Sequence, residues 1–231
     1  MTARRFSVLC LDMAGTTVRD DDTVMNAFQA AIASRNLPAA EFRTAMKYAV
    51  ATMGQSKIEV FRHIFGDESA ARAANTTFEQ TYGKSVAAGE LSPIPGAVEL
   101  FAACRDAGIK VCLSTGFSPV TREAIVETLG WRSLVDLFLS PADAGRGRPW
   151  PDMPLTSLLR LGGGSVHELG VVGDTPSDVE CGLRAGAGLV AGVRTGASTA
   201  AELSAVPVAT GLPGQPVILD SVADLAQHLG L

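Results

Sequence analysis

The sequence lacks the features that mark several common classes of protein. Its four cysteines, Cys10, Cys104, Cys112 and Cys181, have neither the spacing of metal ligands nor a CxxC motif. The net charge is −5, and no polybasic tract is present. No apolar run approaches the length that spans a membrane, and there is no Walker lysine motif. These absences predict a cytoplasmic protein with reduced thiols and with neither nucleic acid nor a membrane as its partner.

What the chain does have is a regular alternation of strand-like and helix-like segments. Short apolar runs that end in polar or glycine-rich turns recur along it, namely SVLCLD, GIKVCLST, LVDLFLS, HELGVVGD and AGLVAGV. Helical patterns lie between most of them, and this order is typical of a parallel sheet with crossover helices. The pattern therefore predicts an α/β core.

One region interrupts this alternation directly behind the first strand. Between residues 20 and 91 the periodicity is that of long amphipathic helices, with no strand signal. Proline and glycine in LSPIPGAVEL then mark the return to alternation. We predict a core domain made of residues 1–19 and 92–231, and an all-helical domain inserted at residues 20–91.

Polar side chains follow the predicted strands at their carboxyl ends, where open α/β sheets bind their ligands. These side chains are Asp12 after the first strand, Ser114 and Thr115 after the second, Arg146 and Arg148 after the third, and Asp174 and Asp178 after the fourth. They are all expected to converge on one edge of the sheet.

Three of these residues, Asp12, Asp174 and Asp178, are carboxylates that would repel one another unless a hard cation lay among them. Oxygen ligands are those that Mg²⁺ prefers, so the pattern implies a divalent ion. Thr115, the backbone amides around Gly116, and Arg148 would form an anion site beside it, suited to a phosphoryl group. The alternatives are that Asp178 merely caps a helix and that Arg148 belongs to a surface ion pair.

These segments resemble a known family. DMAGTT, LSTGF, GRGRPWPDM and VVGDTPSD are similar to the four ordered motifs of the haloacid dehalogenase (HAD) superfamily, and the helical insert resembles its C1-type cap. The resemblance implies a Rossmann-like HAD core with Asp12 as a nucleophile that forms an aspartyl-phosphate. It implies that Asp12, the carbonyl of Ala14 and Asp174 hold Mg²⁺ with support from Asp178, while Thr115 and Arg148 hold the phosphoryl oxygens.

Ala14 indicates which subgroup of the superfamily the chain resembles. Most phosphatases and mutases of the superfamily have a second aspartate at this position, which acts as a general acid. DMAGTT resembles the phosphonatase subgroup, whose phosphonoacetaldehyde hydrolase breaks a carbon–phosphorus bond. In that reaction the leaving group is carbon, and a bare carbanion is too unstable to depart. An amine must first convert the aldehyde to an iminium, which accepts the electrons.

Four lysines could supply this amine: Lys47, Lys57, Lys84 and Lys110. MGQSKIEVFR resembles the phosphonatase segment that carries the Schiff-base lysine, and Lys57 matches that position. A lysine on a cap loop could move over Asp12 on closure, where desolvation favours the neutral amine. The alternative is a solvated lysine early in a helix. Lys47 is a weaker candidate, since the helical period places it beside Ala51.

The chain also departs from the phosphonatase pattern, because Val60 replaces a histidine of the cap and Phe117 replaces an aromatic hydroxyl. Hence we expect a Mg²⁺-dependent hydrolase of a small carbonyl phosphonate, such as phosphonoacetaldehyde or a different member of that class. A phosphatase for a small phosphate ester, similar to phosphoglycolate phosphatase, is the alternative. A third interpretation is a non-catalytic binding protein. The intact carboxylates argue against it, because a protein without catalysis would not need them. The resemblance also permits a homodimer formed through the caps.

Overall fold

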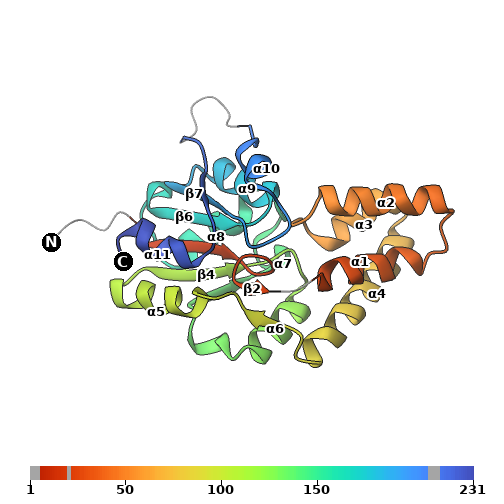
Figure 1. Cartoon of the computed structure of the whole chain (residues 1–231), viewed down its shortest axis with the longest axis horizontal. Coiled ribbons are helices and arrows are strands. Elements are labelled where there is room, and N and C mark those ends of the chain that lie inside the picture. Colours follow the sequence, from red (N-terminus) through yellow and green to blue (C-terminus); the bar gives the residue numbers. More distant parts are fainter. Residues whose placement is uncertain (1–5, 20–21, 208–213) are drawn as a thin grey trace.

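The computed structural model describes residues 6–19, 22–207 and 214–231, and its centre is a parallel β-sheet. Within these residues, six strands form the sheet in the order β5-β4-β1-β6-β7-β8 (Figure 1). Their bounds are Val8–Asp12 (β1), Lys110–Ser114 (β4), Leu137–Leu139 (β5), Leu169–Gly173 (β6), Leu189–Val193 (β7) and Val217–Leu219 (β8). Every neighbouring pair is parallel, which confirms the predicted α/β class. Strand β8 was not expected from the sequence.

Helices cover both faces of this sheet, so its central strands are buried on both sides. In β1, Leu9 and Leu11 belong to the larger apolar cluster, and Val8 and Cys10 belong to the other. The first face is covered by α5 (Ala97–Ala107), α6 (Pro119–Thr128) and α11 (Ala223–Leu229), and the second by α8 (Asp152–Arg160), α9 (Pro176–Ala185) and α10 (Ala200–Ser204). Three short helices, α7 (Pro141–Ala144), η1 (Trp131–Ser133) and η2 (Val166–Glu168), complete the core. All four cysteines are free and buried, which agrees with the predicted reduced thiols.

The two helices that follow β4 and β6 begin with strong local signals. Ser118 accepts a hydrogen bond from the backbone N–H of Thr121 at the start of α6. At the start of α9, Thr175 and Asp178 form a capping box, and Pro176 occupies the first helical position. These caps fix where each chain segment turns from strand to helix, which is where the functional residues lie.

The remaining helices pack on one another beside the sheet and form the lobe on the right of Figure 1. They are α1 (Thr23–Ala33), α2 (Ala39–Ala51), α3 (Lys57–Phe65) and α4 (Glu68–Ala87). Their core is aromatic: the ring of Phe28 lies 5.5 Å from that of Phe61 and 4.9 Å from that of Phe78, between centroids. None of the described helices combines the length and the hydropathy needed to cross a membrane.

The chain enters and leaves this helical part through a small antiparallel ribbon. Strand β2 (Val18–Arg19) pairs with β3 (Ser92–Pro93), so that both connections lie side by side. Strands of two residues carry no period, and the sequence did not predict them. Residues 20–21 are outside the described residues, and they include the first predicted domain boundary. The division into a core at 1–19 and 92–231 and a cap at 20–91 stays a prediction.

Candidate active site

A cavity of about 400 Å³ lies where the carboxyl ends of the central strands meet the helical lobe. Asp12 is the last residue of β1, and its sheet partner Ser114 is the last residue of β4. Asp174 follows the final residue of β6, the strand on the other side of β1. Side chains that are far apart in the sequence therefore meet here because their strands are neighbours, as the strand-end rule predicts.

The three predicted carboxylates form one buried cluster. Ligand oxygens of Asp12, Asp174 and Asp178 all lie within 4.8 Å of one another. Burial raises the pKa of Asp12 to about 7, although the positive charge of Arg148 opposes the rise. Burial also raises the pKa of Asp174 well above its usual value, and the charges of Asp12 and Asp178 add to the effect. Such a set of buried carboxyl oxygens fits a hard divalent cation, which would offset both the repulsion and the desolvation.

The surroundings of Asp174 are shaped closely around its carboxyl group. A Cβ atom on Gly15 would lie 2.5 Å from one carboxyl oxygen, and one on Gly196 would lie 1.8 Å from it. Gly15 also has φ +85°, which disfavours any other residue. Thr16 Oγ1 donates to Asp174 at 3.3 Å, and so does the backbone N–H of Ala197 at 3.3 Å. The pocket therefore holds this carboxyl group in one orientation.

Arg148 is buried rather than on the surface, so the surface ion-pair alternative is excluded. Its guanidinium lies 2.5 Å from a carboxyl oxygen of Asp12 and 2.8 Å from one of Asp178. It also donates to the carbonyl and the hydroxyl of Ser114, at 2.9 and 2.7 Å. A planar cation held beside the end of β1 can bind an anion that Asp12 approaches. Asp178 is both a helix cap and a partner of this guanidinium.

The other predicted phosphate ligands line the same cavity. The Thr115 side chain is buried, and its Oγ1 accepts a hydrogen bond from the backbone N–H of Phe117 at 3.3 Å. Gly116 is in close contact with the loop before α3, because a Cβ there would lie 2.4 Å from the carbonyl oxygen of Gln55. Arg146, in contrast, points elsewhere: it is exposed, pairs with Asp152 and stacks on Trp150. Arg146 therefore does not line this cavity.

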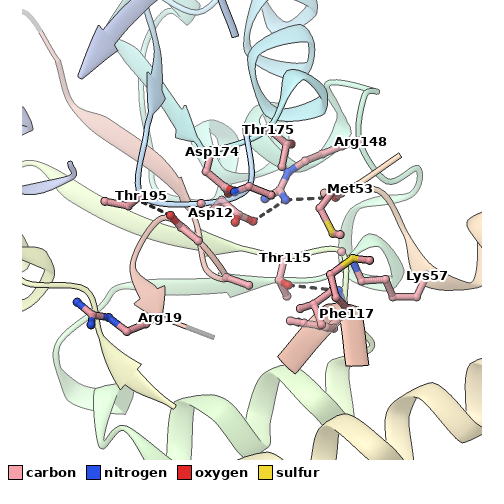
Figure 2. Close-up of a pocket in the computed structure, with 18 of the residues that line it drawn as sticks. Asp12, Arg19, Met53, Lys57, Thr115, Phe117, Arg148, Asp174, Thr175 and Thr195 are labelled. Atoms are coloured by element: carbon pink, nitrogen blue, oxygen red, sulfur yellow. Dashed lines mark hydrogen bonds and ion pairs between the residues drawn. The ribbon is translucent and has the colours of Figure 1, made fainter. Parts of the chain in front are cut away.

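Lys57 also lines the cavity, on the side opposite the carboxylates (Figure 2). It is the first residue of α3 and is only 6% exposed, so it is not the solvated lysine of the alternative interpretation. Its Nζ donates to the carbonyl of Gln55 at 3.4 Å. Aromatic rings surround the amine, with centroids 5.2 Å (Phe117), 5.4 Å (Phe28) and 6.0 Å (Phe78) from Nζ. Lys47 is exposed on α2 and does not line this cavity.

Contacts of the loop before α3 with the core hold Lys57 over the site. The backbone N–H of Lys57 donates to the carbonyl of Gly116 at 3.4 Å, and Arg148 donates to the carbonyl of Gly54 at 3.4 Å. Gly54 has φ +85°, and a Cβ on it would lie 2.5 Å from Thr175 Oγ1. The loop and the core are therefore in close contact, with the amine enclosed between them.

Ala14 lines the cavity two residues beyond Asp12 and brings no acid to it. Among the described lining residues, the carboxyl groups are those of Asp12, Asp174 and the exposed Asp22. The three histidines, His63, His167 and His228, are exposed and lie away from the cavity. No histidine or tyrosine is therefore among the residues that the structure places in its lining.

Sequence reasoning missed the contribution of the segment after β7. Thr195, Gly196 and Ala197 line the cavity, and Thr195 Oγ1 donates to the carbonyl of Gly15 at 2.6 Å. This segment follows a predicted strand at the same sheet edge, and that position was the available signal. Its residues act through the hydroxyl of Thr195, the backbone N–H of Ala197 and the close contact of Gly196 with Asp174.

Comparison with known proteins identifies the family of this fold and site. A haloacid dehalogenase-like hydrolase model matches residues 6–186, which is well over half of the sequence. The chain therefore belongs to the haloacid dehalogenase-like hydrolases.

Curated relatives match only part of the chain. The phosphonoacetaldehyde hydrolase of Parabacteroides distasonis is 35% identical over 97 residues, which cover 41% of this chain and 36% of that protein. A phosphonoacetaldehyde hydrolase of Bacillus cereus is 36% identical over 100 residues, with the same coverage of 41% and 36%. The matched part thus spans little more than a third of the length of these relatives.

Solved structures match almost the whole chain. A hydrolase from Pseudomonas syringae has a TM-score of 0.79 at 22% identity, covering 96% of this chain and 97% of its own. A phosphonoacetaldehyde hydrolase-like protein from Oleispira antarctica has a TM-score of 0.78 at 25% identity, covering 98% and 92%. A phosphoglycolate phosphatase, so described, from Haemophilus somnus has a TM-score of 0.74 at 19% identity, covering 98% and 99%. The fold of the HAD hydrolases thus extends over the whole chain.

Proposed function

We propose that this protein is a Mg²⁺-dependent hydrolase that cleaves the carbon–phosphorus bond of a small carbonyl phosphonate such as phosphonoacetaldehyde. The observation that carries the proposal is the placement of one buried amine, that of Lys57, in the same cavity as Asp12. The absence of an acid at Ala14 fits the same reaction, because no leaving oxygen has to be protonated. The names of the curated relatives agree with it, although they match only part of the chain.

The reaction begins at Lys57. Its amine adds to the substrate carbonyl carbon, and water leaves to give a protonated imine. A carboxyl oxygen of Asp12 then attacks phosphorus, while the electron pair of the carbon–phosphorus bond moves into the iminium. The products of this step are an enamine on Lys57 and a phosphoryl group on Asp12. Protonation of the enamine carbon and hydrolysis release acetaldehyde, and a second water releases phosphate from Asp12.

The remaining polar groups of the cavity bind and orient the phosphonate. Arg148 and Thr115 lie at the ends of the strands beside Asp12, where they can hold phosphoryl oxygens. We propose that Asp12, Asp174 and the carbonyl of Ala14 hold Mg²⁺, with Asp178 in support. When bound, this ion supplies positive charge to the phosphoryl group and to the attacking carboxylate. Arg148 and Asp178 stay paired, which fixes the guanidinium during the reaction.

Aromatic rings around Lys57 suit a cation at this point of the cavity. The faces of Phe117, Phe28 and Phe78 attract a positive charge, and this attraction is stronger where water is excluded. The iminium is such a cation, and it is the group that accepts the electrons. The rings therefore favour the intermediate that makes carbon a possible leaving group.

The test compares phosphate release from phosphonoacetaldehyde and from phosphoglycolate, with Mg²⁺ present, in the wild type, Lys57→Arg and Lys47→Arg. Arginine keeps the positive charge but cannot form the imine, and Lys47 is the exposed control on the same lobe. We expect Lys57→Arg to reduce phosphonate hydrolysis to background, whereas Lys47→Arg stays at the wild-type rate. If only phosphoglycolate is hydrolysed, and at the same rate in both variants, the protein is an ester phosphatase and the proposal is wrong.

A further inference from the structure

The cavity has two chemically different walls. Its polar wall consists of Asp12, Thr115, Arg148 and Asp174, which lie at the carboxyl ends of the strands or follow them. Its apolar wall consists of Val24, Met25, Met53 and Phe117. Figure 2 shows Met53 and Phe117 beside Lys57, whereas Asp12 and Asp174 lie together on the other side. The exposed Arg19 and Asp22 also line the cavity.

The apolar wall lies at the lysine end of the cavity. Val24 and Met25 precede Phe28 by four and three residues on α1, so they share its helix face, and the Phe28 ring is 5.4 Å from Lys57 Nζ. The Phe117 ring is 5.2 Å from the same atom, on a loop of the core. Val24 and Phe117 are 5% and 2% exposed, which makes this part of the wall well enclosed.

The chemistry of the proposed function fixes how a substrate lies between the two walls. Phosphorus must reach Asp12, and the carbonyl carbon must reach Lys57 Nζ, with one methylene group between them. The third substituent of the carbonyl carbon then extends beyond the lysine end, toward the apolar wall. In an aldehyde this substituent is a hydrogen, which leaves the wall without a contact. The volume of about 400 Å³ lies in the range of pockets that hold larger ligands, roughly 300–1,000 Å³.

We propose that the preferred substrate is a 2-oxoalkylphosphonate, in which the carbonyl carbon carries an alkyl group that packs on Val24, Met25, Met53 and Phe117. This inference rests on the proposed function and specifies its substrate class. The ketone carbonyl and the amine of Lys57 form an imine with loss of water, and attack by Asp12 then breaks the carbon–phosphorus bond. Hydrolysis at both sites yields a methyl ketone and phosphate, so that one phosphonate and one water are consumed overall.

The test measures kcat/KM for phosphonoacetaldehyde, 2-oxopropylphosphonate and 2-oxobutylphosphonate by phosphate release with Mg²⁺ present. One methylene group in an apolar pocket changes kcat/KM by roughly tenfold or more. We therefore expect 2-oxopropylphosphonate to exceed the aldehyde by about tenfold and 2-oxobutylphosphonate to exceed it by about a hundredfold. A preference for the aldehyde, with no turnover of the ketones, would overturn this inference and leave the proposed function standing. Release of phosphate from esters alone would overturn both.

A matched pair of variants tests the apolar wall itself. Met25→Gln keeps the length of a half-buried side chain and puts a polar amide on the wall, whereas Met46→Gln makes the same change on α2, away from the cavity. We expect Met25→Gln to lower the ketone-to-aldehyde ratio of kcat/KM about tenfold, and Met46→Gln to leave the ratio unchanged. If the ketone-to-aldehyde ratio of kcat/KM is the same in Met25→Gln and Met46→Gln, the apolar wall does not select the substrate and the inference is wrong.

Discussion

The core and the helical lobe contribute to the cavity in opposite ways. The core supplies three buried carboxylates and a guanidinium that pairs with two of them, Asp12 and Asp178, so its part of the site is charged. The lobe supplies one amine enclosed by aromatic rings. Under the proposed function, this difference corresponds to a division of roles in which the core acts on phosphorus and the lobe determines which group can leave.

The largest effect is expected from the core. Asp12→Asn removes the attacking oxygen anion but keeps a side chain of nearly the same size, so turnover of any phosphonate or ester should fall by about 10⁴-fold or more. Phosphate release measures the loss, and a trapped imine on Lys57 should still form in the variant. If the Asp12→Asn variant still releases phosphate, Asp12 is not the nucleophile. The proposed assignment of the phosphorus chemistry to the core would then be wrong.

A smaller effect on activity is expected from the hydrogen bonds that join the lobe to the core. The carboxylate of Glu79, on α4 beside Phe78, accepts hydrogen bonds from Ser118 and from Thr121 Oγ1, the latter at 2.6 Å. Hydrogen bonds to a charged group contribute about 1.5–3 kcal/mol, so Glu79→Ala should raise KM for the phosphonate about tenfold. The exposed neighbour Gln80 provides the control, Gln80→Ala. Equal KM values in the two variants would contradict a role for this contact.

The smallest effect is expected in the stability of the metal-free protein. The pKa of Asp12 is about 7 in the folded protein and 3.8 as its reference value, so the folded state keeps a proton that the unfolded chain loses. Stability should therefore fall as the pH rises from about 4 to about 7, and the raised pKa of the buried Asp174 carboxyl group acts in the same direction. Because the proposed Mg²⁺ site uses the ionised carboxylates, we expect the ion to raise Tm at pH 8 but not at pH 5.

Asp12→Asn removes this buried carboxyl group, which should raise the stability of the metal-free protein. The change also weakens the ion pair with Arg148, so we expect only a small net gain in stability. At pH 8 without Mg²⁺ the variant should be more stable by about 1 kcal/mol, or about 2–4 °C in Tm. Thermal melts at pH 5 and pH 8 measure the difference, which should shrink at the lower pH. A wild type whose stability rises with pH across this range would contradict the raised pKa of Asp12.

The sequence predicted the parts of this site that follow from strand order. Asp12, Thr115, Arg148 and Asp174 come after apolar runs, and parallel strands bring such positions to one edge. Lys57 was indicated by the resemblance of its segment to a known family and by nothing in its helical period. Its burial could not be predicted, because an amine at the start of an amphipathic helix is usually exposed.

The aromatic enclosure of that amine was beyond sequence reasoning for a physical reason. Phe28, Phe78 and Phe117 come from two helices of the lobe and a loop of the core, and their convergence depends on how those parts pack. Thr195 and Ala197 were missed because a lone threonine hydroxyl and a backbone N–H leave no chemical pattern in the sequence. Tertiary packing, rather than local propensity, determined both features.

The most direct measurement is the capture of the imine. Phosphonoacetaldehyde and borohydride are added to the wild-type protein with Mg²⁺, and the modified residue is located by peptide mass mapping. The account predicts an ethyl group on Lys57, left by reduction after phosphorus has departed, with the other three lysines unmodified. Unmodified Lys57 in protein that releases phosphate from the same phosphonate would contradict it.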